Sequence, residues 1–281
     1  MLTNLSDETF EQFLAQAAVH DTINLKDMTF IDPFGMVGVL ITGRYFQSIS
    51  ADKKLVLPKS DNVLKYLERM DFFKYCDRYF DGDGEAKDIH DKFLRKSYSD
   101  VLLEITAIEK SDDIHFIVNK VKKRAHSILK NHLHYDENAI NGFIVALSEV
   151  CQNIIEHSEQ TGLVGIQKYH FQKQNKNVVK IAVMDLGIGF SGSLSERVSL
   201  SNDLEAIEMG LLQGVSRHLD EGRGHGLAAV RKFVQNWNGK ISIRSGTAKL
   251  SIIPSWSWGK AREHNLTSFP GSQINIMLPE V

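Results

Sequence analysis

Two short segments in the second half of the sequence carry residue types that suit the binding of a phosphorylated, ring-containing ligand. Glu149 and Asn153 lie four residues apart in ALSEVCQNIIEH, so on a helix the carboxylate and the amide share one face. Asp185 follows the apolar run VVKIAVM, with Gly187 and Gly189 close behind it in DLGIGF. A carboxylate at such a turn can accept a hydrogen bond from a ligand amine, while the glycines leave room for a flat ring.

A third segment is rich in glycine and leads into a helix. Gly222, Gly224 and Gly226 alternate with other residues in GRGHGLAAVRKFV, where His225 and Leu227 flank the last glycine. Free N–H groups and the dipole at a helix N-terminus favour phosphate. The pattern is not a P-loop, because no GK[ST] follows, and it is not the dinucleotide fingerprint, because no strand directly precedes it. Each of the three segments, taken alone, also fits a structural role: a solvated helix face, a tight turn or a hinge.

Taken in order, the segments resemble the N, G1 and G2 boxes of the histidine-kinase-like ATPase superfamily, which includes gyrase B, the Hsp90 chaperone, histidine kinases and MutL. The resemblance covers roughly residues 100–281. It extends to PGSQINIMLP, which is similar to the final strand of the kinase branch. It implies a two-layer α/β sandwich that binds ATP together with Mg2+.

The resemblance also implies a role for each matching residue. Asn153 would coordinate the Mg2+ that bridges the nucleotide phosphates, and Glu149 would be the general base or would orient water. Asp185 would bind the adenine amino group, and Ser272 would support Asp185 or an adenine-bound water. Residues 190–221 would form a mobile lid over ATP. The other matching residues would shape the adenine pocket or contact phosphates: Gly187, Gly189, Gly222, Gly224, His225, Gly226 and Leu227.

The elements that position these residues predict an α/β chain of two domains. Residues 1–95 form a small α/β domain and residues 96–281 form the sandwich, with the acidic stretch 77–91 between their cores. Strands are expected at 22–25, 54–57, 101–108, 165–171, 178–184, 240–244, 248–252 and 273–278. Helices are expected from Ser6 to His20, around 36–41, and at 62–70, 113–129, 137–157 and 227–236.

The N-terminal part resembles STAS-type domains, the anti-sigma factor antagonists, over MTFIDPFGMVGVLITG. In that family a strand ends in D-S-S-G, and a partner kinase of the same ATPase superfamily phosphorylates the second serine. Here Asp32 and Gly35 remain, but Pro33 and Phe34 replace the serines. The resemblance therefore implies a docking or regulatory domain that is not switched at this position. An ordinary strand, turn and helix fits the same residues.

The resemblances together favour an ATP-binding signalling protein of the anti-sigma serine-kinase type, which regulates or phosphorylates a protein partner through its STAS-like domain or lid. Two alternatives remain: an ATPase that couples hydrolysis to a conformational cycle, and a non-catalytic module that responds to ATP or ADP. A homodimer is compatible with each of them. A conventional histidine kinase is not indicated, because no upstream histidine has the H-E-x-x-[NT]-P context.

Composition excludes several classes of partner. With 33 basic and 35 acidic residues, the net charge of −2 provides no positive field for nucleic acid or an anionic membrane. Cys76 and Cys151 are the only cysteines and form no CxxC, so neither a zinc site nor a disulfide framework is expected. The N-terminus lacks signal-peptide features, and the apolar run 34–42 is too short to span a bilayer. We therefore expect a cytoplasmic protein.

Overall fold

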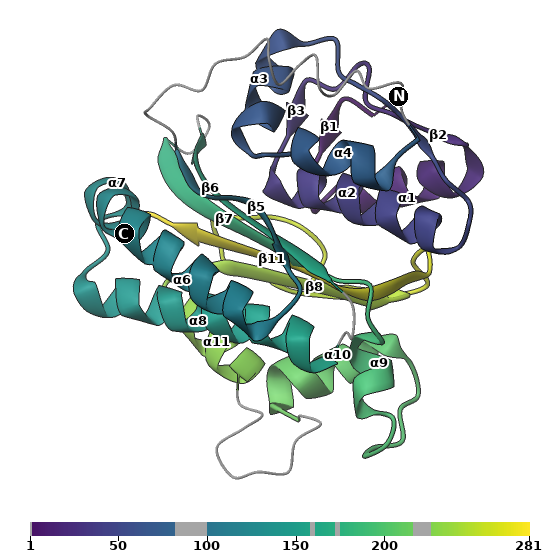
Figure 1. Cartoon of the computed structure of the whole chain (residues 1–281). Helices are drawn as coiled ribbons and strands as arrows, with labels where there is room; N and C mark the ends of the chain where they lie inside the picture. The colour runs from purple at the N-terminus through teal and green to yellow at the C-terminus, as the bar shows by residue number, and fades with distance from the viewer. Residues whose placement is uncertain (1, 82–99, 158–160, 172–174, 216–225) are drawn as a thin grey trace.

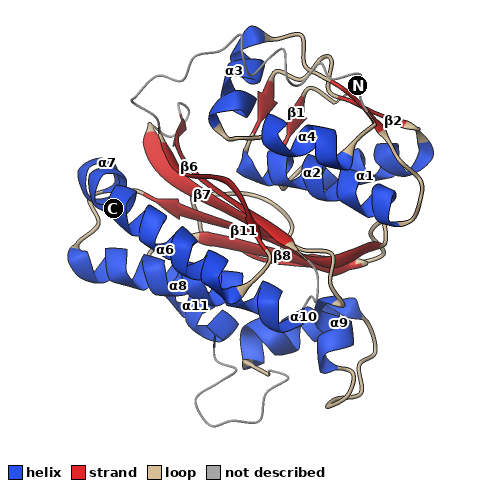
Figure 2. Ribbon diagram, viewed as in Figure 1, coloured by secondary structure: helices blue, strands red, loops and turns tan. Residues whose placement is uncertain are grey.

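The computed structural model describes residues 2–81, 100–157, 161–171, 175–215 and 226–281. Within them the chain forms three layers, with a sheet in the middle (Figure 1). Residues 2–81, called the N-terminal unit below, cover one face of the sheet, and helices cover the other face (Figure 2). The predicted domain boundary at residue 95 lies outside the described residues.

The N-terminal unit alternates short strands with helices, as the sequence pattern predicts. The helix expected from Ser6 begins later, at Phe10, because residues 6–9 form a turn in which the Ser6 N–H donates to Thr9 Oγ1 at 3.0 Å. The elements are β1 (Asn4–Leu5), α1 (Phe10–Val19), β2 (Thr22–Asn24), β3 (Phe30–Ile31), α2 (Pro33–Ser48), β4 (Lys54–Val56), α3 (Asp61–Arg69) and α4 (Phe73–Tyr79).

The rest of the described chain supplies the sheet and the helices on its far face. Its first elements are β5 (Val101–Ile108), α6 (Ser111–Ala125), η1 (His126–Lys130), α7 (Asn131–Leu133), α8 (Glu137–His157), β6 (Gly162–Phe171) and β7 (Lys176–Met184). They are followed by α9 (Gly189–Leu194), α10 (Asp203–Glu208), η2 (Met209–Gln213), α11 (Gly226–Asn236), β8 (Lys240–Gly246), β9 (Ala248–Ile252), β10 (Arg262–Glu263) and β11 (Phe269–Pro279).

The sheet has the strand order β10-β9-β8-β11-β7-β6-β5, and its neighbouring strands are antiparallel. Along each strand, alternate side chains point to opposite faces. On β8, Ile241 and Ile243 join the core beneath α6, α8 and α11, and on β11, Ile274 and Ile276 do the same. The α/β class and the sandwich of helices on an antiparallel sheet are confirmed.

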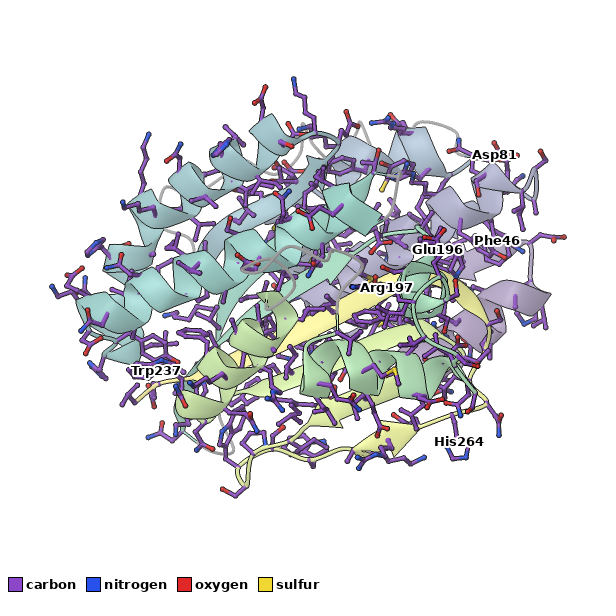
Figure 3. All side chains as sticks on the ribbon, turned by 90° about the horizontal axis from the view of Figure 1, so that it is seen from below. Phe46, Asp81, Glu196, Arg197, Trp237 and His264 are labelled. Atoms are coloured by element: carbon purple, nitrogen blue, oxygen red, sulfur yellow. The ribbon has the colours of Figure 1, made fainter. Side chains whose placement is uncertain are left out.

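The helical layer is held by an apolar stripe on α8. Phe143, Leu147, Val150 and Ile154 recur at helical spacing and are buried against the sheet and the neighbouring helices. Trp237 follows α11 and packs against Tyr135, with ring centroids 4.8 Å apart. Figure 3 views this layer from the helical side, with Trp237 at one end and Glu196 and Arg197 toward the other. Among the described residues, we find no helix with the length and apolar character needed to cross a bilayer.

The N-terminal unit packs on the sheet through α2. Asp32 caps this helix by accepting a hydrogen bond from the Gly35 N–H at 2.9 Å, and Pro33 occupies its first turn. Every residue from Pro33 to Gly43 is buried, because the helix lies between its own unit and strands β6 and β7. One apolar cluster therefore joins the N-terminal unit to the sheet residues Val101, Ile105, Leu163, Ala182, Met184 and Phe269.

A set of ion pairs, in which the cations are buried and Glu8 and Glu11 are partly exposed, joins the same two layers. Four cations on the sheet face four carboxylates of the N-terminal unit, and we call these eight residues the charged interlock. Lys180 Nζ lies 2.8 Å from Asp32 Oδ2, and Arg244 Nε lies 2.5 Å from Glu11 Oε1. The remaining contacts, at 2.8 Å each, are Lys240 with Glu8 and Lys249 with Asp7. Charges buried in this way require partners, so the interlock specifies how the unit sits on the sheet.

One pair of the interlock predicts a response to acid. Burial raises the pKa of the Glu8 carboxyl, but the Lys240 ammonium outweighs this and lowers the pKa to about 2 from 4.5. The stabilisation is therefore complete above pH 4.5 and is lost as the pH falls toward 2. We expect the free energy of unfolding of the wild type to fall by about 2 kcal/mol more than that of Glu8→Gln over this interval. Urea unfolding of both proteins across the interval measures the difference, and parallel curves would contradict it.

Candidate functional site

Asp185 lies at the point where β7 ends, on the face of the sheet that the helices cover. Its side chain is held from two directions: the Gly187 N–H donates to Oδ1 at 2.7 Å, and Ser272 Oγ donates to Oδ2 at 2.9 Å. The residue is only 6% exposed. Burial raises the pKa of the carboxyl, although both hydrogen bonds oppose the shift. Because an ionised carboxylate has about four acceptor positions, capacity remains for a ligand donor.

The turn after Asp185 is fixed by a serine of strand β8, which lies beyond β11 in the sheet. Ser245 Oγ accepts a hydrogen bond from the Phe190 N–H at 3.1 Å and donates to the Gly271 carbonyl at 2.8 Å. Gly189 has a φ of +66°, and a Cβ there would come within 2.5 Å of Ser245 Oγ. Only glycine fits this position, so the predicted requirement for Gly189 has a structural cause.

Glu149 and Asn153 lie on α8, one turn apart and both partly buried. Glu149 Oε2 packs against Gly226, so closely that a side chain on Gly226 would overlap it. Gly226 is the first residue of α11, and Leu227 follows it. The carboxylate thus lies beside the N-terminus of α11, where the helix dipole favours an anion.

Asn153 provides a test of whether the residues suit Mg2+. Within the described part of the chain, its Nδ2 is buried and has no hydrogen-bond partner, so the protein does not use the full capacity of this amide. An amide oxygen is a hard ligand of the kind that Mg2+ accepts, usually together with phosphate oxygens and water. The described residues contain no group of three or more His, Cys, Asp or Glu side chains that could hold a metal without such help. Asn153 Oδ1, and not the unpartnered Nδ2, is the atom that would hold such a Mg2+, with phosphates and water as its other ligands.

The predicted site residues gather in two groups on the helical face. Asp185, Gly187, Gly189 and Ser272 form the first group, which surrounds the end of β7. The second group lies where α8 meets α11, and it consists of Glu149, Asn153, Gly226 and Leu227. Gly222, Gly224 and His225 lie outside the described residues. The assigned roles of all these residues stay predictions.

The segment predicted to be a lid is largely folded where it is described. Ile207 and Leu211 are fully buried in the core beneath the sheet. Asp203, the first residue of α10, accepts hydrogen bonds from Ser191 Oγ at 2.5 Å and from the Thr247 N–H at 2.7 Å. The described part of this segment is therefore anchored through α10 and η2, and residues 216–221 lie outside the described residues.

Sequence reasoning missed two residues that shape the first group. Ser245 is one of several polar residues in the strand KISIRSG, so nothing in the sequence singles it out. Asp203 belongs to no motif. A signal for Ser245 exists only in the register, because Ser245 lies opposite Ser272 in the pairing of β8 with β11. The sequence offers no equivalent signal for Asp203, whose partners come from α9 and from the turn between β8 and β9.

Comparison with known proteins identifies the second half of the chain. Residues 139–280, half of the sequence, match the family described as "Histidine kinase-, DNA gyrase B-, and HSP90-like ATPase". No curated protein matches the sequence. One similar solved structure is the histidine kinase domain of the blue-light activated histidine kinase from Erythrobacter litoralis EL346. It shares 12% identity over 96% of this chain and 92% of that one, with a TM-score of 0.28, which is too low to carry an argument.

Proposed function

Because the chain belongs to the histidine kinase-, DNA gyrase B- and HSP90-like ATPases, we propose that it is an ATP-binding signalling protein similar to the anti-sigma serine kinases. In this proposal it binds Mg-ATP and then regulates or phosphorylates a protein partner. The observation that carries it is the buried carboxylate of Asp185, which Gly187 and Ser272 hold in place on the helical face of the sheet. A carboxylate fixed there is matched to the exocyclic amine of adenine.

The two groups of residues divide the work of binding. Asp185 accepts from the adenine amine, with Ser272 fixing its orientation and the turn at Gly187 and Gly189 giving the ring access. The N-terminus of α11 at Gly226 and Leu227 faces the phosphates, preceded by Gly222, Gly224 and His225. Asn153 would hold Mg2+, which neutralises phosphate charge when it is bound. The Glu149 carboxylate orients the attacking hydroxyl or water and accepts its proton.

For the N-terminal unit we propose a docking role. Residues 1–95 would be a STAS-like domain and residues 96–281 the ATPase domain. Pro33 and Phe34 offer no hydroxyl for phosphorylation, and Asp32 is fully buried against Lys180. The unit would therefore present a partner-binding surface without being modified at this junction.

A second candidate is an ATPase that hydrolyses ATP without a protein substrate. The contact between Glu149 and Gly226 supports it, because a general base at Glu149 would act beside the predicted phosphate site. One assay distinguishes the kinase function from the ATPase function. Purified protein is mixed with substoichiometric γ-labelled Mg-ATP, and the label is resolved as bound ATP, free phosphate or phosphoprotein. Free phosphate supports the ATPase, transfer to an added partner supports the kinase, and retention as ATP supports a sensor.

Asp185→Asn is expected to weaken Mg-ATP binding by about 100-fold, because a buried amide would place an N–H donor toward the adenine amine. Equilibrium dialysis with labelled ATP measures the loss. Because burial raises the pKa of Asp185, removing this charge should not lower the thermal stability of the free protein. The same exchange at Asp136, which caps the first turn of α8 at Ala139, serves as the control and should leave the affinity unchanged.

Inosine triphosphate sharpens this test, because it carries a carbonyl where ATP carries the amine. The wild type should bind it weakly, since the carbonyl of the base and the Asp185 carboxylate are both acceptors and would face each other. Asp185→Asn should reduce the difference in affinity between ATP and inosine triphosphate. If the variant binds ATP as tightly as the wild type does, Asp185 does not read the base.

A further inference from the structure

Strands β8 and β11 connect the two faces of the sheet through adjacent residues. Arg244 and Gln273 are opposite each other in the register and point toward the N-terminal unit, whereas Ser245 and Ser272 are the next pair and point toward the helices. The serines hold the turn at Asp185, as described above. A displacement of these strands therefore moves side chains on both faces of the sheet.

The side chain of Arg244 is only 1% exposed and contacts several separate segments of the chain. It binds Glu11 of α1 through Nε at 2.5 Å and Nη2 at 3.4 Å. Its Nη1 donates to Gln273 Oε1 at 3.2 Å and to the Gly246 carbonyl at 3.3 Å, and Nη2 donates to the Thr267 carbonyl. The guanidinium also lies 5.9 Å from the ring of Phe269, which packs edge-on against Phe10 of α1.

Two routes lead from Arg244 to the residues that follow Gly189. The first is the backbone of β8: the next residue, Ser245, accepts from the Phe190 N–H. The second begins at the turn at Gly246, where Thr247 donates to Asp203, which in turn accepts from Ser191. Burial raises the pKa of Asp203, but these hydrogen bonds and the charge of Arg244 outweigh it and lower the pKa. Both routes end at the start of α9.

We propose that Arg244 is a positioning residue through which the N-terminal unit sets the affinity of the nucleotide site. The inference rests on the proposed function, since it names the regulation of that same site. With Glu11 in place, the guanidinium is neutralised and holds the Gly246 turn and the start of β11. Without it, a buried cation lacks its carboxylate, so it must shift toward the carbonyls of Gly246 and Thr267, which it already contacts, or draw in water. Either response loosens the start of α9, which carries Phe190 and Ser191.

Glu8 offers a matched control for Glu11. Both carboxylates belong to the same N-terminal segment and bind cations of the same strand, but the partner of Glu8 is Lys240, four residues before Arg244. The described contacts of Lys240 reach Asp7, Glu8 and the Trp258 carbonyl, and none leads to the turn at Asp185. Glu8→Gln therefore weakens the interlock without touching either route.

The first experiment needs no nucleotide. Hydrogen exchange of the Phe190 amide is compared in the free wild type, Glu11→Gln and Glu8→Gln. We expect exchange about tenfold faster in Glu11→Gln, and faster again in Glu11→Ala, with Glu8→Gln within twofold of the wild type. Equal acceleration in Glu11→Gln and Glu8→Gln would reduce the effect to general loosening and overturn the proposal, as would no change in either. Circular dichroism and the melting temperature identify a variant that fails to fold.

The second experiment measures Mg-ATP affinity of the same proteins. We expect Glu11→Gln to bind about tenfold more weakly than the wild type and Glu8→Gln to bind equally. By reciprocity, Mg-ATP should slow amide exchange in α1 of the wild type. Equal affinities in the wild type and Glu11→Gln would overturn the proposal. A wild type that binds no ATP would contradict the proposed function instead, and the exchange of Phe190 would still decide whether Arg244 couples the layers.

Discussion

Replacing Glu149 by alanine is expected to slow release or transfer of the γ-phosphate by about 1000-fold, with Mg-ATP affinity within threefold of the wild type. In the proposed function the carboxylate would act only when a hydroxyl or water attacks, whereas binding would depend on the adenine and phosphate contacts. Glu149 Oε2 lies against Gly226 at the start of α11, where the proposed function expects the phosphates. Single-turnover assays with labelled ATP, run beside equilibrium dialysis, separate the two quantities.

Glu137 supplies the control for this prediction. It lies on the same helix, is 55% exposed and pairs with Lys130 at 3.0 Å, so Glu137→Ala should leave both quantities unchanged. Glu149→Gln should resemble Glu149→Ala in the chemical step, because the amide keeps the shape but cannot accept a proton. Unaltered turnover in both Glu149 variants would remove the residue from the mechanism. A wild type with no turnover, even with partner proteins present, would leave only the sensor function.

The second large effect concerns stability. Burial raises the pKa of the Asp32 carboxyl even beside Lys180, but unlike Asp185 this carboxylate pairs with a buried cation. Asp32→Asn is expected to lower the free energy of unfolding by about 3–5 kcal/mol, because it leaves the buried ammonium of Lys180 without its counter-charge. The asparagine keeps the cap, since its side-chain oxygen can still accept from the Gly35 N–H. The loss of stability therefore measures the contribution of the ion pair and not that of the cap at the start of α2. Urea unfolding at pH 7 measures it.

A double variant separates the pair from its surroundings. Asp32→Asn combined with Lys180→Met removes both charges, and most of the lost stability should return, because a neutral side chain of similar length fills the same space. Lys180→Met alone should also be destabilising, since it leaves the Asp32 carboxylate buried and unpaired. If the double variant is as unstable as Asp32→Asn, the loss comes from packing and the buried ion pair is not its cause.

Much of the secondary structure follows from periodicity. Strands β5 and β9 have the predicted bounds, and α8 runs over the predicted residues 137–157. These elements alternate or repeat their apolar residues with a clear period, so their buried faces can be identified from the sequence. The short helices α9 and α10 were not predicted, because their sequences are rich in glycine and serine or too short to show a period.

The packing of the N-terminal unit on the sheet could not be predicted. Lys180, Lys240 and Arg244 occupy polar positions of their strands, which in an isolated sandwich would face water. Their burial depends on carboxylates that lie 148 or more residues away in the sequence, and no local pattern pairs residues so distant. More of the candidate site could be predicted from the sequence, since its motifs are local. The hydrogen bonds that Ser245 and Asp203 contribute arise only from strand pairing and turn geometry, so they could not be predicted.

The central position of β11 constrains when the protein can fold during its synthesis. Of the strands in the sheet, β11 is the last to leave the ribosome, yet it lies between β8 and β7. Until residue 269 has emerged, both neighbours have an open edge, and the apolar helix α2, made far earlier, lacks the finished surface that it covers. Contacts such as Arg244 with Glu11, 233 residues apart, form only after most of the sequence exists. A nascent chain of this design exposes sheet edges and an apolar helix throughout its translation, so it folds late and needs protection from aggregation until then.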